Sequence, residues 1–395
     1  YTPRTLFPYT TLFRSLVIIK RNIMVPPMAN LAEMLKTRDN NFNFIRVVAA
    51  LFVLVSHAYP LSRGAAEVEP LAAQLGISLG GLGVFTFFCI SGFFISLSYQ
   101  RSRTKVDFVV ARFLRLYPAL LVVLVLSACV VGPLFTNMSL HDYFTSSEVY
   151  SYVAANLKLK SIQFQLPGLF QDNPYPGING SLWTLYYEVL LYALVLILGV
   201  VGFLKSSPRI SVFFVLYFLF YFAFGFLLAE ERISPSFQMR MWVQWSFAFV
   251  IGMLLYAYRF KIRLDYRILS VCWLVTLFLY KSPVFVEAFV VAWSYSVFWA
   301  GFNTQWFARN FNRLGDYSYG LYIYAFPTQE ILAHLWKGIS PVTMILVALP
   351  LALIPAVLSW HFIEQPCILR KKAMAERLSQ SLAKLSGMLT KYSTK

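Results

Sequence analysis

The sequence predicts an all-α polytopic membrane protein with about ten transmembrane helices and both termini in the cytoplasm. Three observations lead to this fold class. Hydrophobic residues make up 58% and charged residues 13% of the 395 residues, and the mean hydropathy is +0.63, far from the usual composition of soluble domains. Apolar stretches of membrane-spanning length recur along the chain, and the basic residues between them favour alternate connections.

Counting these stretches against the roughly 20 residues that cross the hydrocarbon core predicts ten spans. They centre on residues 44–59, 79–99, 116–135, 182–204, 210–229, 243–258, 268–280, 283–302, 317–335 and 342–362. The first and the seventh are short. With no internal repeat and no second soluble domain in view, we expect one transmembrane domain over residues 41–366. It follows an N-terminal extension, residues 1–40, and precedes a basic cytoplasmic tail, residues 367–395.

Lysine and arginine outnumber aspartate and glutamate by 34 to 17. In a membrane chain this excess is typical of the positive-inside bias and does not indicate nucleic-acid binding. Threading the ten spans places most basic clusters on the starting side, including Arg101, Arg103, Lys105, Arg112, Arg115, Arg259, Lys261, Arg263 and Arg267. The opposite side receives few, so both termini are expected in the cytoplasm.

The chain ends and the longest connection carry weaker signals. Residues 1–15 match no targeting pattern, and we interpret them as a translated artefact preceding a natural start at Met24, Met28 or Met34, with a signal peptide as the weaker alternative. Proline and glycine near the end of the outer connection 136–181 predict an ordered lid or substrate loop. The tail 376–395 predicts a helix near anionic lipid.

Two polar residues stand out in the first span. Arg46 and His57 are separated by ten residues, all apolar except Ser56. Eleven helical steps place them about 16 Å apart and within roughly 20° of one helix face. Ionisable residues inside an apolar span tend to mark functional sites. The alternatives are an interfacial histidine without a task and an arginine that extends to the membrane surface.

A second basic pair, Arg112 and Arg115, precedes Tyr117 and Pro118. Residues three apart share a helix face, and two guanidinium groups suit phosphate oxygens at the cytoplasmic surface. The alternative is a pair of ordinary topology signals. The four cysteines have no metal-type spacing, and we expect no metal site and no disulfide framework.

Glu188 lies roughly two turns into the fourth span, at about the depth of His57. An intramembrane carboxylate needs a partner or a proton. We expect Glu188 to orient or charge-balance His57 or to bind a substrate hydroxyl, with a structural hydrogen bond as the alternative. Trp183 and Tyr187 of the same segment are expected to bind substrate. Glu330 is a weaker case, and His334 receives no role.

These patterns together resemble the acyltransferase 3 family of membrane-bound acyltransferases, whose bacterial members mostly O-acetylate surface polysaccharides. The resemblance covers roughly residues 40–372. Its motifs are the Arg46 and His57 pair, the glycine-rich segment 83–93, the Arg112 and Arg115 pair, Trp183 with Glu188, and the segments 314–324 and 362–366.

The sequence departs from the family pattern at three positions. Asn43 and Phe85 stand where many members have aspartate, and Ala325 stands where many have histidine before an aromatic residue and a proline. The last change implies that this position is not needed for proton transfer here, or that the substrate differs.

The resemblance implies an enzyme of the bacterial inner membrane that transfers an acyl group, acetyl in the first instance, from cytoplasmic acyl-CoA to a hydroxyl of an extracytoplasmic glycan or lipid-linked sugar. His57 would act as general base, or as an acyl-histidine relay, with Glu188 orienting it. Arg46, Arg112 and Arg115 would hold the phosphates of acetyl-CoA.

The rival hypothesis is a transporter or flippase for a lipid-linked sugar or small solute. In it, His57, Glu188 and Arg46 line a pathway or relay protons. It predicts inverted repeats and paired broken helices, which the sequence does not show.

Overall fold

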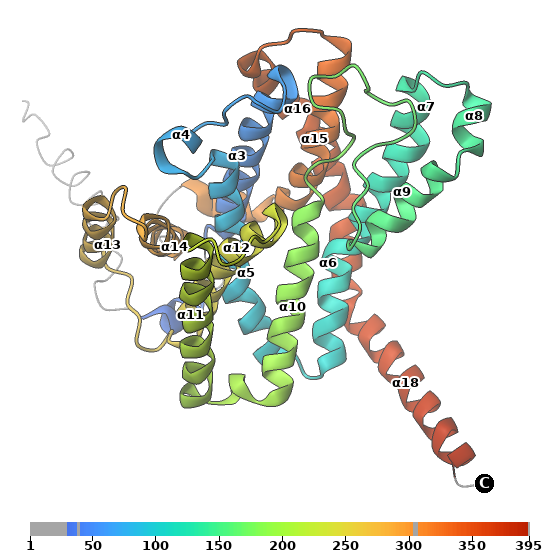
Figure 1. The fold of residues 1–395 in the computed structure, drawn as a ribbon. Helices are drawn as coiled ribbons and strands as arrows, with labels where there is room; N and C mark the ends of the chain where they lie inside the picture. Colours follow the sequence, from blue (N-terminus) through green and yellow to red (C-terminus); the bar gives the residue numbers. More distant parts are fainter. Residues whose placement is uncertain (1–29, 38–39, 303–306, 394–395) are drawn as a thin grey trace, which may run out of the picture.

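The computed structural model describes residues 30–37, 40–302 and 307–393, and over these ranges the chain is helical without a β-strand (Figure 1). The long helices are α3 (Phe42–Arg63), α5 (Leu79–Arg101), α6 (Lys105–Leu126), α10 (Trp183–Val201), α11 (Ser207–Ala229), α12 (Phe237–Ala257), α13 (Tyr266–Phe278), α14 (Phe285–Phe302), α15 (Ser318–Leu335), α16 (Pro341–Ser359) and α18 (Lys371–Ser393). Short helices are α2 (Leu31–Met34), α4 (Ala72–Leu75), α7 (Gly132–Phe135), α8 (Leu140–Thr145), α9 (Ser147–Lys158) and α17 (Gln365–Leu369). Residues 1–15, Met24 and Met28 lie outside the described residues.

Seven helical segments in the described part of the chain are long and apolar enough to cross a membrane: Phe42–Arg63, Leu79–Arg101, Lys105–Phe135, Trp183–Val201, Ser207–Ala229, Phe285–Phe302 and Pro341–Leu369. Helices also occupy the other three predicted positions, but they do not meet this description. With 13 residues, α13 is short, whereas α12 and α15 are long enough and less apolar. The all-α membrane fold is confirmed, and ten spans remains a prediction.

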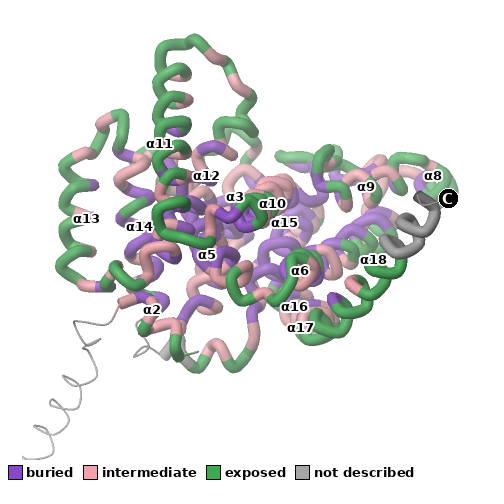
Figure 2. Tube along the Cα trace, turned by 90° about the horizontal axis from the view of Figure 1, so that it is seen from below, coloured by how far each residue is buried: buried purple, intermediate pink, exposed green. Residues whose placement is uncertain are grey.

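Burial explains why α12 and α15 are less apolar. Most of their side chains are buried against neighbouring helices: α12 packs on α5, and α15 packs on α16 and α3. The buried residues gather where α3, α5 and α15 meet, whereas α11 and α13 lie at the periphery (Figure 2). Only 11% of the apolar window of α11 is buried inside the protein. A helix surrounded by protein tolerates polar groups that find partners there.

Glycine sets the closest helix crossing. Gly92 of α5 faces the carbonyl of Phe249 in α12, and Gly252 of α12 faces the carbonyl of Cys89 in α5, so a Cβ at either glycine would overlap the opposite backbone. Small residues allow such close approach between membrane helices. Gly92 and Gly252 thus serve the packing of α5 against α12.

Two long helices each contain one π-helical turn, η1 (Ser127–Val131) between α6 and α7 and η4 (Trp360–Glu364) between α16 and α17. In both cases a proline follows two residues later, Pro133 and Pro366. Proline lacks the N–H that would continue the regular ladder and crowds the preceding turn. A wider turn accommodates this break, and in η4 it carries Glu364 into the interior, where the side chain is 1% exposed.

The two ends of the helical bundle differ, and we name them by the residues of α3. At the His57 end lie the connection 64–78 with α4 and the connection 136–182 with α8 and α9, which meet where Gly64 faces the carbonyl of Pro174 (Figure 1). At the Arg46 end lie the turn from α5 to α6 and the start of α18. This last helix confirms the helical prediction for the tail.

The connection 136–182 is ordered, as predicted. The Tyr143 hydroxyl donates to the carbonyl of Ala128 at 2.8 Å, and the Asn179 amide donates to the carbonyl of Ile323 at 2.9 Å. The Asn173 amide donates to the Glu330 carboxylate at 2.6 Å. These bonds join the connection to η1 and α15. Glu330, which the sequence left without a firm role, thus holds this segment on the bundle.

Candidate active site

Arg46 and His57 lie on one uninterrupted helix, α3, as the sequence predicts. Their separation of eleven residues corresponds to about 16 Å along the axis. The surroundings of the two residues are different, so we describe each in turn.

At the Arg46 end, buried carboxylates bind two of the predicted arginines. Arg115 donates through Nη2 to Asp316 at 2.7 Å and through Nη1 to Glu364 at 2.8 Å. Arg46 lies 3.3 Å from the same Asp316 carboxylate. Ser359 donates to Glu364 at 3.0 Å, and Ser318 donates to Asp316 at 2.5 Å. This network ties α3, α6, η4 and the start of α15 together.

Asp316 lies in the short connection before α15. Burial by itself raises the pKa of the Asp316 carboxyl, but the guanidinium groups of Arg115 and Arg46, together with the Ser318 hydroxyl and backbone N–H, hold that pKa below its ordinary value. The carboxylate is therefore charged at neutral pH and forms true ion pairs with both arginines. Sequence reasoning missed Asp316 and Glu364 as partners. The sequence did offer one signal for them, because a carboxylate that is buried in so apolar a chain needs a partner.

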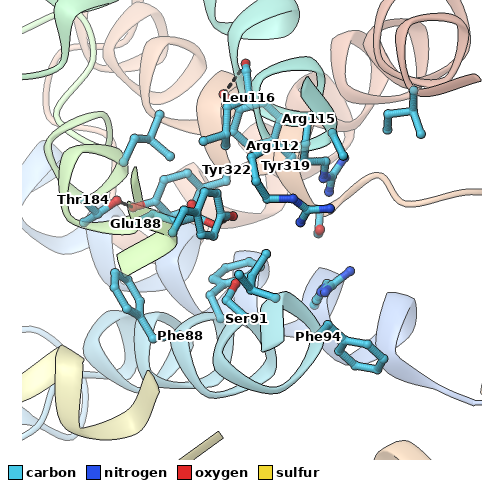
Figure 3. Close-up of a pocket in the computed structure, with 18 of the residues that line it drawn as sticks. Phe88, Ser91, Phe94, Arg112, Arg115, Leu116, Thr184, Glu188, Tyr319 and Tyr322 are labelled. Carbon is cyan, nitrogen blue, oxygen red and sulfur yellow. Dashed lines mark hydrogen bonds between the residues drawn. The ribbon is translucent and has the colours of Figure 1, made fainter. Parts of the chain in front are cut away.

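A cavity of about 320 Å³ opens beside this network (Figure 3). Its polar lining includes Arg46, Arg112, Arg115, Glu188, Tyr192, Ser91, Thr184 and Lys371, and its apolar lining includes Val84, Phe87, Phe88, Phe94, Ile95, Leu116 and Leu185. The cavity thus has cations toward the Arg46 end and an aromatic, apolar wall along α5. Such a mixture fits a ligand that is anionic at one end and apolar along its length.

Arg112 differs from Arg115 although both line the cavity. In the described part of the chain it forms no ion pair, and its Nε is buried without a hydrogen-bond partner. Its contacts are a long hydrogen bond of 3.5 Å to the Ser98 hydroxyl and the ring of Tyr192, 5.8 Å from the guanidinium carbon. Arg112 is therefore the cation with hydrogen-bonding capacity left for a ligand.

Glu188 also lines the cavity, where it accepts a hydrogen bond from the Tyr192 hydroxyl. It interacts electrostatically with Arg112 and Arg115. The structure does not bring Glu188 to His57, since no contact joins the two. Glu188 lies with the arginines of the cavity instead, because counting turns along one helix could not tell toward which neighbouring helix the side chain points.

His57 lies outside the cavity lining, at the other end of α3. Its ring packs edge-on against Phe326 at 5.3 Å between centroids, and its Nδ1 is buried without a hydrogen-bond partner. The carboxylate that acts on it electrostatically is Glu69 of the connection 64–78. The sequence gave no sign of this residue, because it lies in a loop without periodicity.

The cavity nevertheless ends close to His57. Tyr322 lines it and packs on Phe87 at 5.8 Å, and Phe326, the ring against His57, follows four residues later on α15. The two positions are four residues apart, which is about one helical turn or ~6 Å along the axis of α15. At the same level the Tyr322 hydroxyl donates to the carbonyl of Ser181, the last part of the connection 136–182.

Trp183 and Tyr187 are turned away from the cavity. Trp183 packs on Trp245 at 4.8 Å, and Tyr187 packs on Trp242 at 6.4 Å, both in α12. Thr184 and Leu185 of the same turn line the cavity instead. Neither aromatic residue lines the cavity. Their role in substrate binding therefore stays a prediction. Over the described ranges, no group of three or more histidine, cysteine, aspartate or glutamate side chains is placed to hold a metal ion.

The chain belongs to the acyltransferase 3 family, because the model of the family's acyltransferase domain matches residues 39–361. An O-acetyl transferase of Shigella phage Sf6 is 30% identical over 344 residues, which is 84% of this chain and 97% of that protein. Nodulation protein 10 of Rhizobium leguminosarum bv. viciae is 36% identical over 163 residues, 39% of this chain and 42% of that protein. No solved structure matches the chain significantly.

Proposed function

We propose that this protein transfers an acetyl group from acetyl-CoA, bound in the cavity at the Arg46 end, to a hydroxyl of a glycan or lipid-linked sugar at the His57 end. Family membership and the likeness to an O-acetyl transferase make it an O-acyltransferase. The observation that carries the proposal is the cavity itself, which begins at unpaired cations and stops one helical turn from the contact of Phe326 with His57.

The donor fits this cavity in charge and shape. Arg112, with an unpartnered buried Nε, and Lys371, at the start of α18 and without an ion pair in the described residues, would bind the phosphates of CoA. Charge-assisted bonds from guanidinium to phosphate are the strong kind. The pantetheine arm would extend along Phe94, Phe88 and Phe87 toward Tyr322. This route places the thioester at the end of the cavity nearest to His57.

Arg115 and Arg46 have a different role in this proposal. Their guanidinium groups are engaged by Asp316 and Glu364, so binding a phosphate would require them to leave buried carboxylates unpaired. They shape and close the wall of the donor site. Glu188 accepts a hydrogen bond from Tyr192 beside Arg112. Its negative charge lowers the net positive charge of the site.

His57 is the proposed general base. Its ring nitrogen takes the proton of the acceptor hydroxyl as the oxygen attacks the thioester carbonyl. The tetrahedral intermediate collapses with cleavage of the carbon–sulfur bond, and the CoA thiolate then receives the proton from His57. The products are an O-acetyl ester and CoA. A relay through acetyl-His57 would use the same residue in two steps.

The charge pattern of the sequence supports an orientation for this reaction. The Arg46 end, with the basic connection from α5 to α6 and the basic start of α18, would face the cytoplasm, where acetyl-CoA is made. The His57 end, with the two long connections, would face the outside. We propose ten membrane-crossing helices, both termini in the cytoplasm and the bacterial inner membrane as location.

The direct test uses purified protein in lipid nanodiscs with acetyl-CoA labelled in the acetyl group. The acceptor is bacterial surface polysaccharide from which mild alkali has removed existing O-acetyl groups. The proposal expects label bound to the polysaccharide and released again by mild alkali, as esters are. The transporter hypothesis expects no covalent label but movement of labelled sugar across protein-containing vesicles, and that outcome would overturn the proposal.

A further inference from the structure

The histidine at the end of α3 has a carboxylate neighbour in a segment that no motif covers. Glu69 lies in the connection 64–78, between α3 and α5, and its side chain accepts a hydrogen bond from the Ser56 hydroxyl, one residue before His57. Glu69 also acts on His57 electrostatically. The carboxylate therefore lies where it faces two consecutive residues of α3.

The backbone around Glu69 is fixed on both sides. The N–H of Ala72 donates to the carbonyl of Glu69 at 3.2 Å, and the N–H of Leu79 donates to the carbonyl of Pro70 at 2.8 Å. Leu71 between them has a φ of 69°, in the left-handed region that leucine seldom adopts. A residue held in this region is kept there by its surroundings. The position of Glu69 is therefore determined by the fold and not by a free loop.

The neighbouring helix leaves room for this carboxylate. A Cβ at Gly80 of α5 would lie 2.9 Å from the Cβ of Ser56 and 3.5 Å from Oε2 of Glu69. Glycine at this position lets α5 approach α3 while the Glu69 carboxylate bonds to Ser56 beside it. Alanine here would press on the pair.

The other candidate partners of His57 are occupied or absent. Glu188 is bonded to Tyr192 in the cavity, and Glu330 is bonded to Asn173. Phe85 and Ala325, two of the three positions at which the sequence departs from the family pattern, carry no ionisable group. His57 Nδ1 meanwhile has no hydrogen-bond partner although it is buried.

We infer that Glu69 is the positioning residue for His57, an inference that rests on the proposed general-base role of that histidine. A carboxylate offers about four lone-pair sites, so Glu69 can accept from Ser56 and from the Nδ1–H of His57 together. This bond fixes the tautomer in which the other ring nitrogen, Nε2, is free to take the acceptor proton. It also stabilises the imidazolium that forms, while the carboxylate itself stays unprotonated.

The test compares Glu69→Gln with Glu67→Gln, a matched change in the same connection at an exposed glutamate. For Glu69→Gln we expect kcat to fall roughly 10- to 100-fold, a part of what a general base contributes. The KM for acetyl-CoA, the binding of CoA and the melting temperature stay as in the parent protein, because the donor cavity is untouched. Glu69→Asp regains part of the rate, and Glu67→Gln keeps it.

A second comparison separates this inference from the proposed function. The double variant His57→Ala with Glu69→Gln should be no slower than His57→Ala alone, since a residue that acts through His57 has no effect without it. Additive losses would overturn the inference, as would full activity of Glu69→Gln or a joint loss of CoA binding and melting temperature. If His57→Ala itself kept its rate, the general-base proposal would fail first.

Discussion

The two ends of α3 are built in opposite ways. Around Arg46, two arginines, Arg46 and Arg115, form an ion-pair network with the buried Asp316 and Glu364 beside an open cavity. Around His57, which lies outside the cavity lining, an imidazole is packed against Phe326 with one ring nitrogen left unpartnered. We propose that the first is the site for a large charged ligand. We propose that the second holds the reacting histidine and that the acceptor reaches it from the side of the two long connections.

Arg112 and Arg115 repeat this contrast within the cavity. They are three residues apart on one helix, so the sequence makes them equivalent. The fold does not, because Arg115 meets Asp316 and Glu364 whereas Arg112 meets no carboxylate at ion-pair distance in the described residues. Measuring the two variants apart therefore sharpens the assignment of binding and structural roles.

The largest expected effect is that of His57→Ala. Removing a general base lowers kcat by roughly 10²- to 10⁴-fold, while CoA binding, measured by calorimetry in nanodiscs, stays unchanged because His57 lies outside the cavity lining. His141→Ala, an exposed histidine of α8, is the control and keeps full activity. Equal rates for the two variants would contradict the account of the His57 end.

Arg115→Ala should mainly reduce stability. It leaves Glu364 buried without its cation and Asp316 with Arg46 alone, and breaking a buried pair in this way costs about 3–5 kcal/mol. Thermal unfolding in detergent measures the loss. Adding Glu364→Gln to the variant should recover part of it, because one unpaired charge is removed. A stable Arg115→Ala protein with a raised donor KM would instead assign Arg115 to the phosphates.

Arg112→Ala should show the reverse pattern. The variant loses charge-assisted bonds worth about 1.5–3 kcal/mol, which corresponds to a rise in the KM for acetyl-CoA of roughly 10- to 100-fold. Its unfolding temperature should stay near that of the parent, since no ion pair is broken. Arg103→Ala, an exposed arginine at the same end, serves as control. An unchanged donor KM in Arg112→Ala would reduce this arginine to a topology signal.

The smallest expected effect is that of Glu188→Gln. Since Glu188 lines the donor cavity near Arg112, removal of its charge should lower the KM for acetyl-CoA by about twofold to threefold and leave kcat within about threefold. Steady-state kinetics at varied donor concentration measures both. A large fall in kcat with an unaltered KM would restore Glu188 to the role beside His57 that the sequence suggested.

The sequence predicted the helices and the linear order of the site well, for physical reasons. Apolar stretches and helical periodicity are local properties, so α3 and its two polar residues could be derived from spacing alone. The partners of Arg115 could not, because they lie 201 and 249 residues further along the chain. The direction of Trp183 toward α12, and the approach of Glu69 to His57, likewise depend on which helices pack together.

The central claim, that an acyl group passes from one side of the membrane to the other along α3, has a direct measurement. Vesicles containing the protein in one orientation are supplied with labelled acetyl-CoA only on the Arg46 side and with de-O-acetylated polysaccharide only on the His57 side. The account predicts alkali-labile label on the polysaccharide, absent when the two substrates are exchanged and absent in His57→Ala. Equal acetylation with donor and acceptor on the same side would contradict it.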